Sequence, residues 1–216
     1  GGHAMTTESR LDIPLGEAIF TQRAIRRFRP DPIPDEVIRD IMEAAIRAPN
    51  GGNRQPWHFL VVKDPDVREE LGELYREAWW AKRKDEGING PEDIAPGKSS
   101  QRSAMRLSSE FAHAPVVVMI CATSGGSGSV IPAAQNLLLA ARSFGIGGTI
   151  TTLHKQVDER AHRLFGIPQS VEIVYCLPLG YPRGRFGSVQ RNPLAEVCSV
   201  DRWGNSIGLD SGAKGG

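Results

Sequence analysis

The sequence predicts one domain that combines α-helices with buried β-strands. The chain has 216 residues, enough for a single domain with a substantial core. Three continuous apolar runs, at residues 57–63, 114–122 and 171–179, have the length and β-branched content of strands. Segments with apolar residues at helical spacing lie before and between these runs. This alternation predicts strands in the interior with helices around them.

The elements are assigned in chain order from these periods. Residues 15–21 and 35–47 carry helical spacing, and Pro34 before Asp35 is typical of a helix start. Residues 57–63 suit a strand buried on both faces, and residues 65–84 indicate a further helix. Residues 114–122 and 171–179 predict two more strands, with a short helix at 157–165 between them. Residues 84–101, rich in Gly and Pro, break every period, so we expect a mobile excursion that covers a site.

Two segments indicate a subunit interface. Residues 130–144 are apolar on nearly every side, and a helix without a polar face has to be central. A chain of 23.5 kDa has limited depth in which to hide such a helix. The residues after Pro182 show no sustained period, yet include Val197, Val200 and Trp203, and each large apolar side chain costs roughly 1.5–3 kcal/mol when left in water. We therefore expect this tail to dock on a second copy of the chain.

Composition excludes several classes of function. Twenty-six Lys and Arg against twenty-five Asp and Glu give a net charge of +1, so no global field attracts nucleic acid or an anionic membrane. The apolar runs are shorter than the ~20 residues of a membrane helix, and no signal peptide is evident. We expect a cytoplasmic protein. Residues 1–4 resemble a cloning remnant ahead of Met5.

Neither metal chemistry nor side-chain catalysis is indicated. Cys121 and Cys176 lie in apolar strand-like runs, where a thiol acts as a small hydrophobe. The histidines lack metal-ligand spacing, and no dyad or triad for acid–base or nucleophilic catalysis stands out. We predict no metal site and no catalytic side chain.

The stretch "TQRAIRRF" groups Arg23, Arg26 and Arg27 within one predicted helical turn. Like charges at this spacing repel by a few tenths of a kcal/mol per pair unless an anion lies between them. The planar guanidinium suits phosphate, because it donates two hydrogen bonds at once. The alternative is a solvated basic face, with or without pairing to Asp35 or Asp40.

Two further stretches are unusually rich in Gly, Asn or Thr. "APNGGNRQPWHF", residues 48–59, either turns the chain or lies against a flat ligand, and its side-chain amides can address the polar edge of a heteroaromatic ring. A simple helix cap explains one glycine but not the whole run. "FGIGGTITTL", residues 144–153, leads from the central helix into an extended stretch, without the glycine spacing of a dinucleotide fold.

Taken in order, these motifs resemble the nitroreductase family of FMN-dependent oxidoreductases over about residues 15–203. The resemblance is carried by the arginine pair, the P-x-x-x-N-x-Q-P-W loop, Q-N-L-L-L-A-A followed by Gly-Ile-Gly, L-G-Y-P, and an arginine before Pro-Leu. It implies an α+β fold, an α/β/α sandwich around a mostly antiparallel sheet, assembled as an intertwined homodimer with two interfacial FMN sites. It divides the chain into an FMN-binding domain at residues 5–182 and an extension at 183–216 that embraces the partner subunit.

The resemblance also implies which residues bind the cofactor. They are Gln22, Arg23, Ala24, Arg26, Pro49, Asn50, Gly51, Asn53, Gln135, Ile150, Thr151, Thr152 and Arg191. The arginines would hold the FMN phosphate, the loop at 49–53 would lie against the isoalloxazine and ribityl groups, and residues 150–152 would flank the other edge of the ring. Gln22 and Ala24 stand where the family often has Arg and Ser, and Val189 stands where it often has Lys.

The activity implied is electron transfer from exchangeable NAD(P)H, through FMN, to nitroaromatic, quinone or similar small acceptors. Donor and acceptor would use one cleft in turn, which predicts ping-pong kinetics. Other FMN chemistries of the same fold, namely flavin fragmentation, dehalogenation and dehydrogenation, stay open, as does a flavin-binding protein without turnover. A nucleic-acid-binding module built on "RRFRP" is disfavoured by the near-zero net charge.

Overall fold

The computed structural model describes residues 5–208, so the remnant-like residues 1–4 lie outside the described part. The helices are α1 (Thr7–Arg10), α2 (Leu15–Thr21), α3 (Asp35–Ala45), α4 (Pro65–Asp85), α5 (Ser99–Glu110), α6 (Ile131–Ser143), α7 (Lys155–Phe165) and α8 (Leu194–Val197). The strands are β1 (Trp57–Val62), β2 (Val116–Ala122), β3 (Gly147–Gly148) and β4 (Glu172–Gly180). Among the described residues, no helix has both the length and the apolar character needed to cross a membrane.

The strands form one sheet in the order β1-β2-β4-β3, and each pairing is antiparallel. All of β2 is buried, and its side chains alternate between two hydrophobic clusters, as the two-residue period of a strand requires. Val116, Val118 and Ile120 join the cluster with α3 and α6. Val117 and Met119 join the cluster with α4 and α5. The sheet therefore lies between two helical layers.

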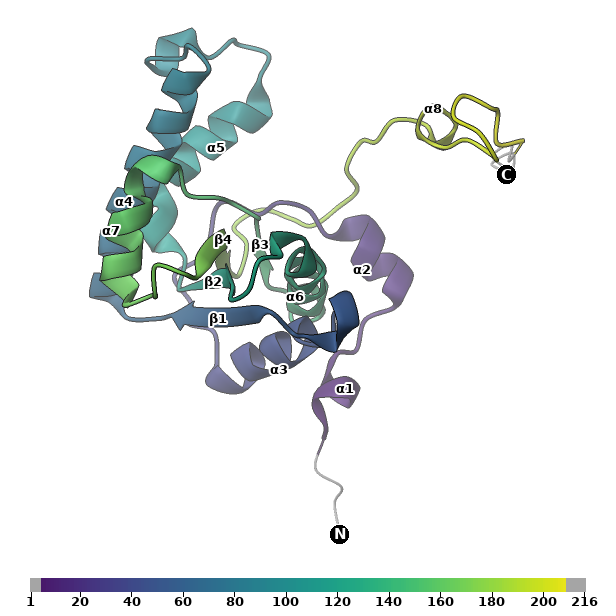
Figure 1. Cartoon of the computed structure of the whole chain (residues 1–216), viewed down its shortest axis with the longest axis horizontal. Coiled ribbons are helices and arrows are strands. Elements are labelled where there is room, and N and C mark those ends of the chain that lie inside the picture. The colour runs from purple at the N-terminus through teal and green to yellow at the C-terminus, as the bar shows by residue number, and fades with distance from the viewer. Residues whose placement is uncertain (1–4, 209–216) are drawn as a thin grey trace.

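Figure 1 shows α4, α5 and α7 gathered together, away from α3 and α6. The predicted α+β sandwich around an antiparallel sheet is thereby confirmed. The central helix is also confirmed, because six of the 13 residues of α6 are buried and five of these belong to the first cluster. The C-terminal segment leaves the sheet after β4, and Figure 1 places α8 well apart from the other elements.

The strand predicted at residues 57–63 packs on both faces but is less deeply buried than β2. Trp57, Phe59 and Val61 contact one hydrophobic cluster, and Leu60 and Val62 contact the other. β1 is an edge strand that pairs with β2. His58 is exposed, and most of the other β1 side chains are half-buried. A continuous apolar run cannot by itself distinguish an edge strand from a central one, since both present the same residue types.

The excursion at residues 84–101 is also more regular than expected. Pro91–Asp93 forms a 3₁₀ turn, Ile94 is buried, and α5 begins at Ser99. Helix α5 is not evident at the start of its sequence, because the first turn of this helix is wholly polar. Its apolar stripe comes later, at Ala104, Leu107 and the adjoining Phe111, where the spacing is helical.

The arginines of "TQRAIRRF" do not share a helical turn. Helix α2 ends at Thr21, and the backbone turns extended at Gln22. The N–H of Ile25 then donates to the carbonyl of Gly148 at 2.9 Å, so a tertiary hydrogen bond replaces the helical one. In the segment 22–27, Arg23 and Arg27 are exposed and Arg26 is half-buried.

Asp40 provides a test of the packing of the N-terminus against α3. Its side chain is 1% exposed and accepts hydrogen bonds from Thr7 Oγ1 at 2.7 Å and from Arg10 Nε at 2.6 Å. The hydrogen-bonded guanidinium lowers the pKa of Asp40 from its ordinary value. We expect Asp40→Asn to reduce the free energy of unfolding by about 1.5–3 kcal/mol at neutral pH, because bonds to the charged carboxylate are lost.

The sign of the pH dependence follows from the lowered pKa. The carboxylate stabilises the fold above the pKa of the unfolded chain, near 4, and this stabilisation disappears as the pH falls through the lower, folded pKa. Urea unfolding at several pH values should show the variant and the unaltered protein converging in acid. Asp31→Asn, in an exposed pair with Arg29, is the control and should change stability little. A gap that stays constant with pH would contradict this assignment.

Candidate cofactor site

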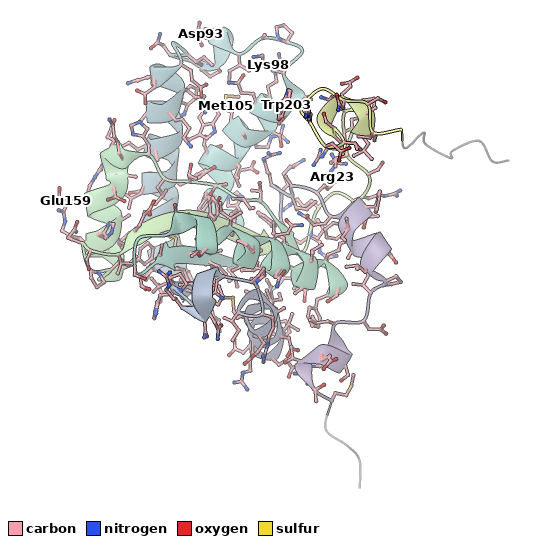
Figure 2. All side chains as sticks on the ribbon, turned by 45° about the vertical axis from the view of Figure 1, so that its right-hand side comes forward. Arg23, Asp93, Lys98, Met105, Glu159 and Trp203 are labelled. Atoms are coloured by element: carbon pink, nitrogen blue, oxygen red, sulfur yellow. The ribbon has the colours of Figure 1, made fainter. Side chains whose placement is uncertain are left out.

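A pocket of about 710 Å³ opens between the arginine segment, α5, α6 and the start of the C-terminal segment. Its lining residues are Gln22, Arg23, Ala24, Arg26, Ser99, Ser100, Ser103, Gln135, Leu138, Gly148, Thr149, Ile150, Val189 and Arg191. None of them is acidic. Figure 2 shows Arg23 beside α2, on the side that faces the C-terminal segment in that view. The pocket is therefore suited to a ligand with negative charge.

The arginines of this pocket have no acidic partner. Within the described residues, neither Arg23 nor Arg26 makes an ion pair or a side-chain hydrogen bond. Asp40 instead pairs with Arg10, and Asp35 pairs with Lys63. The alternative of a basic face paired with these two carboxylates is therefore excluded.

Partial burial lowers the pKa of the Arg26 guanidinium, and the neighbouring Arg23 adds to that effect. Burial and the repulsion from Arg23 both make the charged form of Arg26 less favourable than it is in water. A bound anion would reverse this effect, because an opposite charge favours the protonated guanidinium.

One lining residue of the pocket, Gly148, lies where the backbone admits no side chain. A Cβ at Gly148 would lie 2.4 Å from the carbonyl oxygen of Pro178, so only glycine fits where β3 meets β4. The Gly148 carbonyl holds the arginine segment through Ile25. Thr149 follows and is 5% exposed, and its hydroxyl has no hydrogen-bond partner in the part of the chain that the structure describes. Because Thr149 lines the pocket, its hydroxyl is available to a polar ligand there.

Residues 151 and 152 point to other parts of the molecule. Thr151 exchanges backbone hydrogen bonds with Cys176, and its hydroxyl donates to the carbonyl of Cys176. Thr152 Oγ1 accepts a hydrogen bond from Lys82 Nζ at 2.6 Å. These contacts tie the stretch after Ile150 to β4 and to α4. Only Ile150, of the three predicted neighbours of the ring, lines the pocket.

The loop at residues 49–53 also lies outside this pocket. It contains a 3₁₀ turn at Gly51–Asn53, and Asn50 Oδ1 accepts a hydrogen bond from the N–H of Gln55 at 2.8 Å. Gly52, Asn53 and Gln55 all have positive φ. The Asn50 amide oxygen is thus used to fix the loop itself, while residues 51–55 stay exposed. Positive φ at Asn53 and Gln55 is uncommon for residues with a side chain, and the hydrogen bond from Gln55 to Asn50 holds the loop in this conformation.

The model of the nitroreductase family matches residues 19–181. The chain belongs to the nitroreductase family. It is therefore an FMN-dependent oxidoreductase of the nitroreductase type, as the sequence motifs imply. An NADH dehydrogenase of Thermus thermophilus is 31% identical over 192 residues, which cover 83% of this chain and 92% of the relative.

Two solved structures share the fold of this chain. The FMN-dependent nitroreductase NfnB of Mycobacterium smegmatis, in complex with NADPH, has a TM-score of 0.67 and 25% identity, covering 87% of this chain and 97% of that one. An iodotyrosine deiodinase bound to FMN and 3-iodo-L-tyrosine has a TM-score of 0.68 and 22% identity, covering 83% and 96%. The second likeness concerns the fold alone.

The pocket of this nitroreductase-family chain unites about half of the residues that the resemblance implies. Gln22, Arg23, Ala24, Arg26, Gln135, Ile150 and Arg191 line it. Pro49, Asn50, Gly51, Asn53, Thr151 and Thr152 do not. Members of the first group come from four separate parts of the chain, so the fold alone brings them together.

Other lining residues were not predicted. They are Ser99, Ser100, Ser103, Leu138, Gly148, Thr149 and Val189. Of these, Val189 stands at a position where the family often has lysine. Gly148 and Thr149 belong to the "FGIGGTITTL" stretch. The stretch was therefore correctly predicted to contact the ligand site, but two of its lining residues were not among the predicted positions. For the α5 serines, a signal was available in the helical spacing of Leu107 and Phe111 further along.

The two cysteines of the strands are free and buried, as predicted. Burial raises the pKa of the Cys121 thiol to about 11 and also raises that of Cys176. Neither forms a thiolate readily at neutral pH. Among residues 5–208, no group of three or more His, Cys, Asp or Glu side chains is placed to hold a metal ion.

Proposed function

We propose that the pocket binds FMN, with its phosphate held by Arg23, Arg26 and Arg191. The observation that carries this proposal is the pair of guanidiniums without acidic partners in a pocket that lacks carboxylates. Thr149 adds a free hydroxyl, and the fixed backbone at Gly148 holds the arginine segment in place. This donor set fits the phosphate and ribityl parts of FMN, because arginine forks and hydroxyls are the usual partners of such groups.

The site is completed, in this proposal, by a second copy of the chain. The loop at 49–53 matches the family motif for the flavin ring, yet it does not line the pocket of its own chain. A homodimer would let the exposed loop of one subunit close the pocket of the other. Exposed apolar side chains support such an interface. They include Leu15, Ile19 and Phe20 on α2, Ile131 on α6, and Trp203 in the C-terminal segment.

The reaction proposed is the oxidation of NAD(P)H and the reduction of a small aromatic acceptor such as a nitroaromatic or a quinone. Bound FMN would supply the redox chemistry, accepting electrons from one ligand and passing them to the next. The residues of the chain hold the cofactor, and the pocket exposes it to one exchangeable ligand at a time. No side chain in the pocket has to act as an acid or base for this role.

Steady-state kinetics test the proposal. With NAD(P)H varied at several fixed concentrations of a nitroaromatic or quinone, we expect parallel double-reciprocal lines, because one ligand must leave before the other enters. Anaerobic addition of NAD(P)H alone should bleach the flavin absorption of the FMN-loaded protein. Intersecting lines would overturn the shared cleft, and flavin that neither nicotinamide reduces would rule out the reductase.

A further inference from the structure

The C-terminal segment is attached to the rest of its chain just before it reaches the pocket. The N–H of Gly187 donates to the carbonyl of Thr21 at 3.0 Å, and Phe186 is half-buried. Residues 188–197 are all exposed. In the described chain from residue 188 onward, the hydrogen bonds join residues of the segment itself. Phe186 and Gly187 are therefore the anchor that precedes Arg191, which lines the pocket.

The ring of Phe186 lies in a notch at the short strand β3. A Cβ at Gly147 would lie 3.1 Å from Phe186 Cε1 and closer still to the side chain of Ile25, so the missing side chain of this glycine makes room for both. Ile25 is the buried residue of the arginine segment, and Phe186 packs against the hydrophobic cluster that contains it. The notch therefore places the anchor directly beside the segment that carries the pocket arginines.

One arginine of α6 contacts this anchor and the end of α2 at the same time. The guanidinium carbon of Arg142 lies 4.2 Å from the centroid of the Phe186 ring, within the range of a cation–π contact. Arg142 Nε donates to Thr21 Oγ1 at 3.1 Å, and Arg142 Nη2 lies 3.6 Å from Glu17 Oε1. The Arg142 side chain is only 17% exposed, so its contacts are largely shielded from water. A single guanidinium thus joins α6, α2 and the C-terminal segment.

Arg142 lies next to the pocket without lining it. Gln135 and Leu138 of the same helix line the pocket, and the helical spacing places Arg142 on their face of α6. Thr21 directly precedes Gln22, the first pocket residue of the arginine segment. The contacts of Arg142 therefore fall on residues adjacent to the pocket and not on a ligand within it.

We propose that Arg142 is a positioning residue for the phosphate site. By contacting both Phe186 and Thr21, it fixes the C-terminal segment, and with it Arg191, relative to the arginine segment at 22–26. This inference rests on the proposed function, because these segments carry the proposed phosphate partners. Arginines that converge on one anion repel one another in its absence, so contacts outside the pocket have to hold them there. The contacts of Arg142 do so without adding a charge to the pocket.

Titration of the flavin-free protein with FMN and with riboflavin tests this role in Arg142→Met, which keeps an unbranched side chain but removes its charge and its N–H donors. We expect the dissociation constant of FMN to rise about five- to tenfold. That of riboflavin should stay within about twofold, because riboflavin lacks the phosphate that Arg191 contacts in the proposal. The matched control is Arg163→Met, which removes an ion pair with Glu159 at 3.0 Å on α7, outside the pocket, and should change neither constant.

Phe186→Leu tests the same contact from the side of the ring. Leucine keeps an apolar side chain in the notch but offers no aromatic face, so we expect FMN to bind about two- to fivefold more weakly. The double variant should resemble Arg142→Met, because both substitutions break one shared contact. Hydrogen exchange of the flavin-free protein gives a readout without a ligand. The amide of Gly187 should exchange about fivefold faster in Arg142→Met, since its bond to Thr21 is less well held.

Three results would overturn the role of Arg142: an unchanged preference for FMN over riboflavin in Arg142→Met, equal losses for the two flavins, or fully additive losses in the double variant. The second result is the one expected of a purely structural residue. If the unaltered protein itself binds FMN and riboflavin equally, the proposed phosphate site fails, and hydrogen exchange at Gly187 alone decides whether Arg142 holds the anchor.

Discussion

Replacing Arg26 by alanine is expected to weaken FMN binding by about 1.5–3 kcal/mol, the range for a hydrogen bond to a charged group. This corresponds to about a 10- to 150-fold higher dissociation constant. Arg26 is half-buried in a pocket without carboxylates, and its pKa is lowered by that burial, so the phosphate would be its main electrostatic partner. Flavin fluorescence titration with FMN and with riboflavin measures the effect. The unaltered protein should prefer FMN, and the variant should lose most of that preference.

Arg27→Ala is the matched control for this experiment. Arg27 is exposed on the same extended segment, but it does not line the pocket. Its backbone carbonyl accepts a hydrogen bond from the N–H of Arg183, which the substitution leaves in place. Equal affinity of the unaltered protein for FMN and riboflavin would refute the phosphate assignment, whatever the variants do.

Removal of the residues after Pro182 should cost solubility, dimer formation and FMN together. The deleted segment contains Arg191, which lines the pocket, and Phe186, which packs beneath the Arg142 guanidinium at 4.2 Å. It also contains Val197 and Trp203, which are exposed and touch no core of their own chain. Because a fully exposed Trp is unfavourable in water, we expect these side chains to be buried against a partner subunit. Light scattering combined with flavin absorption measures assembly and cofactor content in one sample.

Point variants separate the two roles of the segment. Arg191→Ala should weaken FMN and leave the dimer intact, since this arginine faces the pocket. Val197→Ser combined with Trp203→Ser should weaken the dimer first and FMN as a consequence, as both residues lie outside the pocket. A stable, FMN-loaded monomer would contradict the completed interfacial site.

The periods of the sequence determined most of the secondary structure, because burial on a strand or helix face imposes its own repeat. Strand β2, which is wholly buried, and helix α6, which is apolar on most of its surface, are the clearest cases. The order of the motifs along the chain predicted the family. Local pattern did not distinguish the edge strand β1 from a central strand, and it did not predict α5, whose first turn is polar and faces a pocket rather than the core.

Only the tertiary structure decided which of the motif residues meet. The arginine segment is extended because Ile25 bonds to Gly148, more than a hundred positions away, and a backbone period does not reveal such a partner. The same packing brings Gln135, Ile150 and Arg191 to the arginines and turns Thr151 toward β4. The order of the motifs along the chain predicted the residues of one site. In the fold, the loop at 49–53 lies outside the pocket, because its own hydrogen bonds and burial hold each segment in place.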